Sequence, residues 1–241
     1  MKNLPVFSVA IAATLILLFN SEGLATVLKA SRRLSGFSPD NRHYIYLETS
    51  RNPVTEVPTA QIQIINIPTN SCVRNGCLKT EYDDSAYSLS NQAAEEDLLN
   101  RTVTVRHSLG LTRLKVGIQL PVLSRTNKAD GTETVTFRLN NQTDPVEIRL
   151  EQKRIPSILS SGSSDVDRAA MRLVINYNYR QLTLGNLNNY REAVSKYSIR
   201  EVRLSPNRNN IVVLIDTLQP ASEGTLQTTL VQSFSLEPFG G

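Results

Sequence analysis

The feature of this chain that most constrains its fold is a two-residue alternation of apolar and polar side chains, repeated in short segments. Successive side chains of a strand point to opposite faces of a sheet, so this alternation is typical of half-buried strands. Turn-forming residues separate the segments, for example Asp130-Gly131 and Asn140-Asn141. The clearest segments read YIYLETS, AQIQIINI, TETVTFRL, PVEIRLE, MRLVINYNYRQLTL, SIREVRLS and IVVLIDTL. We therefore expect a mainly β fold built of antiparallel meanders.

One segment departs from this period and predicts a single α-helix inserted into the β fold. Ser90 is a candidate N-cap, acidic residues follow it, and Gly110 stands where a helix would end. The β-branched run from Thr102 to Val105 weakens this helix. The apolar residues that would form its buried face are Ala94, Leu98, Val105 and Leu109.

Two hairpins far apart in the chain share their turn chemistry. Ser38-Pro39-Asp40 and Ser205-Pro206-Asn207 are 167 residues apart, and an apolar strand follows each of them. Proline fixes φ and the Asp or Asn side chain caps the turn. The offset is close to four units of the roughly 40 to 45 residues that form one propeller blade. A propeller-like arrangement and a β-sandwich both remain open.

The N-terminal residues have the pattern of a secretory signal peptide. Lys2 precedes an apolar run, and small residues lead to a cleavage site near Ala25. That run is about 15 residues long, shorter than the roughly 20 that a helix needs to cross a membrane. We predict a signal peptide over residues 1–25 and a single β-rich domain over residues 26–241, secreted or periplasmic. Contact with a membrane is expected only through the signal segment, if it stays uncleaved.

The two cysteines of the chain, Cys72 and Cys77, favour a disulfide bond in an oxidising compartment. Two free thiols or a metal site are the alternatives, and no further metal ligands stand nearby. We therefore predict a disulfide and no metal site.

The sequence carries no signature of catalysis or cofactor binding. The two histidines, His43 and His107, are not at metal-ligand spacing, and no glycine-rich phosphate loop is present. The net charge of +4 is mild and its basic residues are scattered, which argues against nucleic acid as a partner. We predict no catalytic residue, no cofactor and no nucleic-acid partner.

Four residues are candidates for contacting a ligand. Tyr44 and Tyr46 share one face of a strand, and Glu48 and Asp216 stand near the ends of the two matching strands. Packing of the tyrosines and solvated strand ends are the alternative interpretation.

Several stretches resemble a known family. GFSPDNRHYIYLET, the helical insertion, YSIREVRLSPNRNNIVVLID and QPASEGTLQTTLVQSFSL are similar to bacterial predicted secreted proteins grouped as domain of unknown function 2259. The resemblance covers most of the chain after residue 25 and implies export, without a catalytic residue. The chain departs from that pattern at Asn41, where glycine is expected, and in having no tryptophan.

These features lead to one main functional hypothesis and two alternatives. The first is a secreted, non-catalytic β domain that binds a protein or a cell-envelope polymer such as a polysaccharide. The second is a carboxylate-based hydrolase acting on envelope glycans. The third is a structural component of an envelope complex that docks through an exposed sheet edge.

Overall fold

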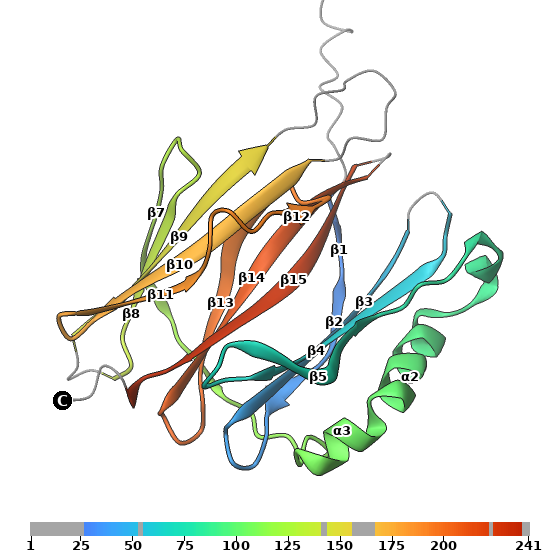
Figure 1. The fold of residues 1–241 in the computed structure, drawn as a ribbon, viewed down its shortest axis with the longest axis horizontal. Helices are drawn as coiled ribbons and strands as arrows, with labels where there is room; N and C mark the ends of the chain where they lie inside the picture. Colours follow the sequence, from blue (N-terminus) through green and yellow to red (C-terminus); the bar gives the residue numbers. More distant parts are fainter. Residues whose placement is uncertain (1–26, 53–54, 141–143, 156–166, 222–223, 238–241) are drawn as a thin grey trace, which may run out of the picture.

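The computed structural model describes residues 27–52, 55–140, 144–155, 167–221 and 224–237, which form three β-sheets and a helical segment (Figure 1). The predicted mainly β fold of antiparallel meanders is confirmed. The helix-side sheet has the order β2 (Ser31–Phe37), β3 (His43–Arg51), β4 (Pro58–Asn66), β5 (Ser71–Lys79). The central sheet has the order β1 (Val27–Lys29), β15 (Gly224–Ser235), β14 (Asn210–Ala221), β13 (Lys196–Leu204), β6 (Ile118–Gln119). The outer sheet has the order β11 (Arg180–Gly185), β10 (Arg168–Tyr177), β9 (Val146–Ile155), β8 (Glu133–Phe137), β7 (Val122–Asn127), and β12 (Arg191–Glu192) pairs with β10.

The central sheet is buried on both of its faces. On β14, Ile211, Val213 and Ile215 pack into the core shared with the outer sheet. Val212 and Leu214, between them in sequence, pack into the core shared with the helix-side sheet. This double burial explains why the sequence IVVLI is continuously apolar rather than alternating.

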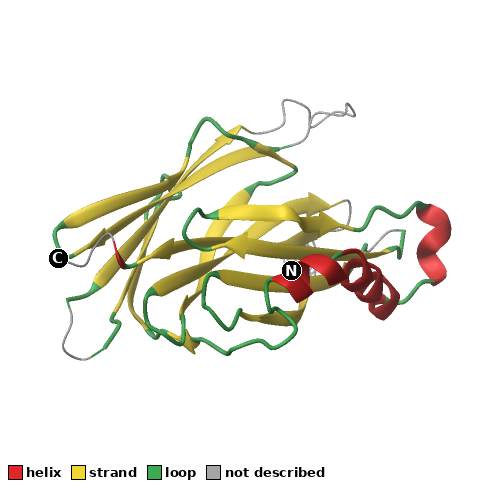
Figure 2. Ribbon diagram, turned by 60° about the horizontal axis from the view of Figure 1, so that its bottom comes forward, coloured by secondary structure: helices red, strands yellow, loops and turns green. Residues whose placement is uncertain are grey.

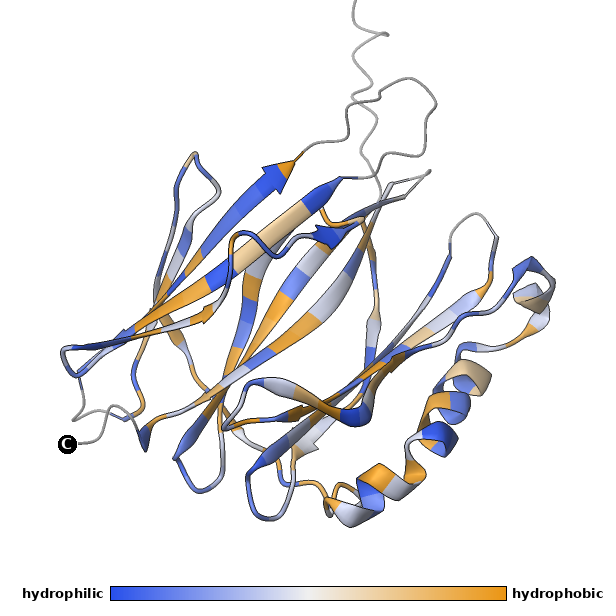
Figure 3. Ribbon diagram, viewed as in Figure 1, coloured by the Kyte–Doolittle hydropathy of each residue, from blue (hydrophilic) through white to orange (hydrophobic). Residues whose placement is uncertain are grey.

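The outer sheet packs one of its faces against the central sheet. Hydrophobic and hydrophilic residues alternate along its strands (Figure 3), and residues such as Ile148 and Leu150 on β9 face the central sheet. Arg149 and Glu151 alternate with them in sequence and are partly exposed. The three sheets thus pack face to face in series, as in a sandwich with an added layer. The closed ring of a propeller is not confirmed.

The predicted helical insertion is present and covers the free face of the helix-side sheet, where Ala94 and Leu98 pack against β3 and β4 (Figure 2). Ser90 is its N-cap, since its side chain accepts a hydrogen bond from Ala93 N (3.0 Å). The expected single helix is divided at Thr102, whose hydroxyl bonds the Leu98 carbonyl (2.7 Å) and whose backbone leaves helical geometry. The helical elements are η1 (Asp84–Ser88), α2 (Asn91–Arg101) and α3 (Val103–Ser108).

The two hairpins that share turn chemistry belong to matching three-stranded meanders. β2, β3 and β4 correspond to β13, β14 and β15, and the pairing Phe37 with Tyr44 recurs as Leu204 with Ile211. Both meanders have a β-bulge at the corresponding place, which leaves Arg33 and Arg200 as the extra residues. The similarity therefore extends well beyond the turns.

The two turns have the same internal hydrogen bonds. The Ser38 hydroxyl donates to Asp40 Oδ1 (2.5 Å) and accepts from the His43 backbone N–H (3.0 Å). The second turn repeats both bonds, from the Ser205 hydroxyl to Asn207 Oδ1 (2.6 Å) and from Asn210 N–H to Ser205 (3.0 Å). The shared sequence motif thus predicts a shared local structure, as the serine-proline-Asx pattern requires.

The two turns also contact each other. The side-chain amide of Asn210 donates to the Asn41 carbonyl oxygen at 2.8 Å, and both residues are buried. Asn41 has a φ of 60°, which asparagine tolerates in place of the glycine expected from the family resemblance. The two meanders therefore stack with their turns side by side at one end of the molecule, which Figure 1 shows at the lower edge.

A single segment joins the first strands of the two meanders. Lys115 exchanges two backbone hydrogen bonds with Phe37 (2.9 and 3.0 Å), and Ile118 pairs with Leu204. Gly117 lies between these contacts, and a Cβ there would be 2.3 Å from Phe37 Cε2 and 2.6 Å from the Leu204 carbonyl oxygen. Only glycine fits between the two strands without displacing one of them.

Candidate functional site

The outer edge of β15 is only partly covered by another strand. β1 pairs with it in parallel over residues 225–227. Beyond that point, side chains from the helix-side sheet bond the outward backbone N–H groups of alternate residues. The bonds run from Thr229 N to Glu48 Oε1 (2.7 Å), from Val231 N to Gln63 Oε1 (3.1 Å) and from Ser233 N to Asn70 Oδ1 (2.8 Å). These side chains satisfy the edge and oppose its pairing with a further strand.

A buried polar network adjoins this edge. Glu48 Oε2 accepts from the Thr229 hydroxyl (2.7 Å), and Arg200 donates to that hydroxyl (2.5 Å) and to the Tyr46 hydroxyl (2.7 Å). Arg200 also forms an ion pair with Asp216 (3.3 Å). Burial raises the pKa of Glu48 above its ordinary value, although the hydrogen bonds from Thr229 and the charge of Arg200 oppose this. The network therefore ties the helix-side sheet to the central sheet.

The structure brings three of the four candidate ligand contacts together, but it buries all four. Tyr46, Glu48 and Asp216 belong to the network of Arg200, with exposed fractions of 0, 2 and 8%. Tyr44 is also fully buried, where its ring packs edge-on against Phe37 at 4.9 Å between centroids. Burial raises the pKa of Tyr44 to about 12. Packing and cross-sheet bonding account for these residues, and contact with a ligand stays a prediction.

The two histidines belong to different elements of the fold. His43 follows the first turn, where burial lowers its pKa and its Nδ1 has no hydrogen-bond partner within the described ranges. His107 lies in the last turn of α3.

A cleft runs along the β15 edge, between β15 and strand β5 of the helix-side sheet. It consists of two hollows of about 510 and 350 Å³ and a small one of about 20 Å³, all of which share Lys79. The first hollow is lined by Asn52, Thr55, Val57, Thr59, Lys79, Thr80, Glu81, Tyr82, Asp84, Gln219, Pro220 and Leu226. The second is lined by Gln61, Ile62, Gln63, Ile65, Asn70, Cys72, Cys77, Leu78, Lys79, Arg191, Leu230, Val231 and Gln232. This cleft is the candidate functional site.

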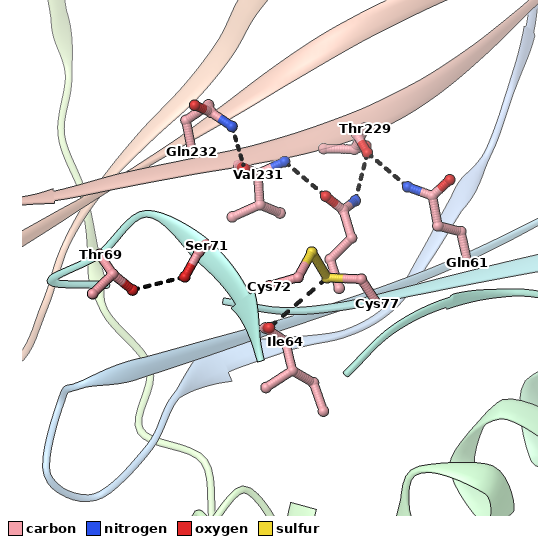
Figure 4. The surroundings of a disulfide bond; sticks show 10 residues. Gln61, Ile64, Thr69, Ser71, Cys72, Cys77, Thr229, Val231 and Gln232 are labelled. Atoms are coloured by element: carbon pink, nitrogen blue, oxygen red, sulfur yellow. Dashed lines mark hydrogen bonds between the residues drawn. A yellow bond between two sulfur atoms is a disulfide. The ribbon is translucent and has the colours of Figure 1, made fainter. Parts of the chain in front are cut away.

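The disulfide forms part of the cleft wall. Cys72 and Cys77 are bonded, with a Cα–Cα distance of 5.8 Å, which confirms the predicted bridge. It closes a bulged turn of β5 that includes Asn75 at a φ of 60°. Figure 4 shows the bridge next to the Ile64 carbonyl of β4 and facing the side chain of Val231 on β15. The bridge therefore holds the β5 wall in position opposite β15.

The sequence gives no direct signal for the cleft residues. Gln61 and Gln63 occupy the polar positions of AQIQIINI, so their alternation indicates a face distinct from that of the isoleucines. Lys79 and Arg191 are far apart in the chain and come together only through the packing of the sheets.

The comparison with protein families places this chain. Residues 54–234 match the family model described as predicted secreted protein (DUF2259). The chain belongs to this family. The match includes β4, β5 and almost all of β15, so the cleft walls lie within the part that the family shares. Comparisons with curated proteins and with solved structures found no match.

The family description bears on location in general terms. It characterises the family as predicted secreted, in line with the expected export of this chain. Within the described ranges, no helix is long and apolar enough to cross a membrane. The predicted signal peptide, residues 1–25, lies outside the described residues and stays a prediction, as does the choice between periplasm and exterior.

Proposed function

We propose that this protein is an exported, non-catalytic β domain that binds a protein or a cell-envelope polymer in the cleft beside β15. The observation that carries the proposal is the cleft itself, an elongated depression whose hollows are joined at Lys79. Its length suits a linear ligand better than a small compact one. Amide, hydroxyl and charged side chains together outnumber the apolar ones in the lining of its two large hollows, as expected of a surface that recognises a polar chain.

The arrangement of carboxylates supports a binding role over hydrolysis. Glu48 and Glu133 are buried and accept hydrogen bonds from backbone N–H groups, those of Thr229 and Ile199. Two acids that line the cleft, Glu81 and Asp84, come from one short segment after β5. The third, Glu48, borders the small hollow, and both of its carboxylate oxygens already accept hydrogen bonds from Thr229. A glycoside hydrolase needs carboxylates on both sides of the bond it cleaves.

Thermal unfolding against a panel of materials tests the proposal. The oxidised chain from Thr26 to Gly241 is unfolded with peptidoglycan fragments, anionic and neutral polysaccharides, calcium or lipid vesicles. A ligand at 100 times its Kd stabilises the folded state by about 2.7 kcal/mol, and each kcal/mol raises the Tm by about 2–4 °C.

The outcomes separate the hypotheses. A shift of several degrees with one polymer that stays intact on prolonged incubation supports non-catalytic binding. A shift accompanied by cleavage of that polymer overturns it in favour of the hydrolase. A flat response overturns binding to an envelope polymer, and a shift with vesicles or calcium alone contradicts the proposed ligand class.

One observation favours the structural-component alternative as a second candidate. All six residues of the edge strand β7 are exposed, and apolar side chains continue along the preceding segment at Val116 and Ile118. An exposed apolar edge can pair with a strand of another protein. Substitution of Ser124 by proline should abolish capture of such a partner, and an unchanged complex would exclude docking through this strand.

A further inference from the structure

The second hollow of the cleft is cationic. Among the residues that the structure describes, Lys79 and Arg191 are the only charged ones in its lining, and no carboxylate is among them. Nine other cationic side chains form ion pairs within the described part of the chain, but neither Lys79 nor Arg191 forms one there. Both side chains are exposed. The hollow therefore presents two positive charges that no acid in its own lining neutralises.

The amide side chains of this hollow are fixed by their own hydrogen bonds. Gln63 donates to the Thr229 carbonyl (2.7 Å) while accepting from Val231 N. Asn70 donates to Gln232 Oε1 (2.8 Å), and Gln232 donates to the Val231 carbonyl (3.0 Å). Each amide nitrogen has two donor hydrogens, so each keeps one beyond the bond described. A ligand thus meets preorganised donors, which reduces the entropy lost on binding.

The β15 edge is poorly suited to an added peptide strand. Its outward N–H groups at residues 229, 231 and 233 already donate to side chains, and the Thr229 carbonyl already accepts from Gln61 (3.2 Å) and Gln63. A peptide binding by strand addition needs these backbone groups free. A ligand recognised through side chains is therefore favoured.

We infer that the second hollow is a subsite for the carboxylate of an acidic glycan, with Lys79 and Arg191 pairing with that carboxylate. The amide N–H groups of Gln63 and Asn70 donate to sugar hydroxyls, and the apolar wall of Leu230 and the disulfide contacts the ring. This inference rests on the proposed function and specifies its ligand. The volume of about 350 Å³ falls in the range of ligand pockets.

A pair of matched ligands tests the inference on the oxidised chain. Oligogalacturonate carries one carboxylate per sugar, and its methyl-esterified form has the same backbone without the charges. We expect calorimetric titration to show binding of the charged oligomer and at least tenfold weaker binding of the ester, because charge-assisted hydrogen bonds are lost. Equal affinities for the two would overturn the carboxylate subsite.

Matched variants locate the site. Lys79→Met and Arg191→Met should each weaken binding of the charged oligomer by about tenfold or more, since each removes one charge from the hollow. Arg113→Met removes an exposed charge from the loop before β6 and should leave the affinity unchanged. Equal effects of all three would indicate general electrostatic attraction and overturn the assignment. Thermal unfolding of each variant without ligand verifies that it is folded.

Two further ligands separate this inference from the proposed function. Tighter binding of poly-glutamate than of the charged glycan, lost in Lys79→Met, would overturn the glycan in favour of an acidic peptide in the same cleft. A neutral glycan offers a second test, with Thr59→Arg in the first hollow as the comparison variant. If Thr59→Arg abolishes binding of that glycan and Lys79→Met leaves it intact, the subsite is overturned and the proposed function is preserved. Absence of binding by every polymer would overturn the subsite and, within the proposed function, would overturn binding to an envelope polymer.

Discussion

Substitutions of Glu48 test whether its carboxylate stabilises the fold or is kept for binding a ligand. Glu48 accepts two hydrogen bonds of 2.7 Å, from the backbone N–H and the hydroxyl of Thr229, and both residues are buried. Glu48→Ala leaves the Thr229 N–H without an acceptor, which costs about 1–3 kcal/mol. Glu48→Gln keeps an oxygen for that N–H and offers an N–H to the hydroxyl, so we expect a change in the free energy of unfolding within about 1 kcal/mol.

Differential scanning calorimetry at neutral pH measures the difference. At about 2–4 °C per kcal/mol, Glu48→Ala should lower the Tm by between about 2 and 12 °C. Glu192→Ala, an exposed acid on β12, is the control and should change stability by less than about 0.5 kcal/mol. A Glu48→Ala variant as stable as the parent, or a Glu48→Gln variant as unstable as Glu48→Ala, would refute the structural role.

The pH dependence of the same comparison has a definite sign. Because burial raises the folded-state pKa of Glu48 above its ordinary value of 4.5, the folded state keeps the proton where the unfolded state has released it. The stability contribution is thus present below the unfolded pKa and is lost as pH rises through the folded pKa. Relative to the parent, Glu48→Gln should gain stability as the pH rises above 4.5. A constant difference would contradict the raised pKa.

Three other substitutions test, by thermal unfolding, contacts that connect different parts of the fold. Gly117→Ala places a Cβ against backbone and ring atoms and should lower the free energy of unfolding by about 1–3 kcal/mol or more. Val116→Ala, at the exposed neighbouring position, should lower it little. Equal effects of the two substitutions would contradict the steric argument. Replacing Cys72 and Cys77 by serine opens a loop of five-residue separation and should cost about 2 kcal/mol, and an unchanged Tm in reductant would argue against it. Asn210→Ala removes the bond between the two turns and should cost about 1 kcal/mol.

The sequence predicted the strands, the turns and the cap of the helix because those depend on neighbouring residues. Ser38-Pro39-Asp40 forms its turn through side-chain bonds within five residues, and Ser90 caps α2 through Ala93. The sequence indicated the division of the helix at Thr102 only through the β-branched run there, which weakens a helix. At this point the Leu98 carbonyl accepts from both the Thr102 hydroxyl (2.7 Å) and the Thr102 backbone N–H (3.1 Å), and such bonding by a threonine side chain bends helices.

The position of the cleft could not be predicted from sequence because it depends on which strand faces meet another layer. Tyr46 and Glu48 alternate with Ile45 and Leu47, a pattern that indicates one solvated face. In the structure the helices cover one face of β3 and the central sheet covers the other, so both sets are buried. Tyr46 and Glu48 therefore form hydrogen bonds between the sheets. The solvent-facing candidates for ligand binding lie instead at the periphery of β4 and β5.

The cleft originates where the two matching meanders differ. In the first, the third strand β4 is flanked by β5 over residues 61–66. In the second, the corresponding strand β15 is flanked only by the short β1, over residues 225–227. The central sheet is therefore narrower than the helix-side sheet on this side, and β5 projects beyond it with its inner face uncovered. Because the stacked turns and the Arg200 network hold the rest of the two meanders in contact, the cleft opens between them at this unmatched edge.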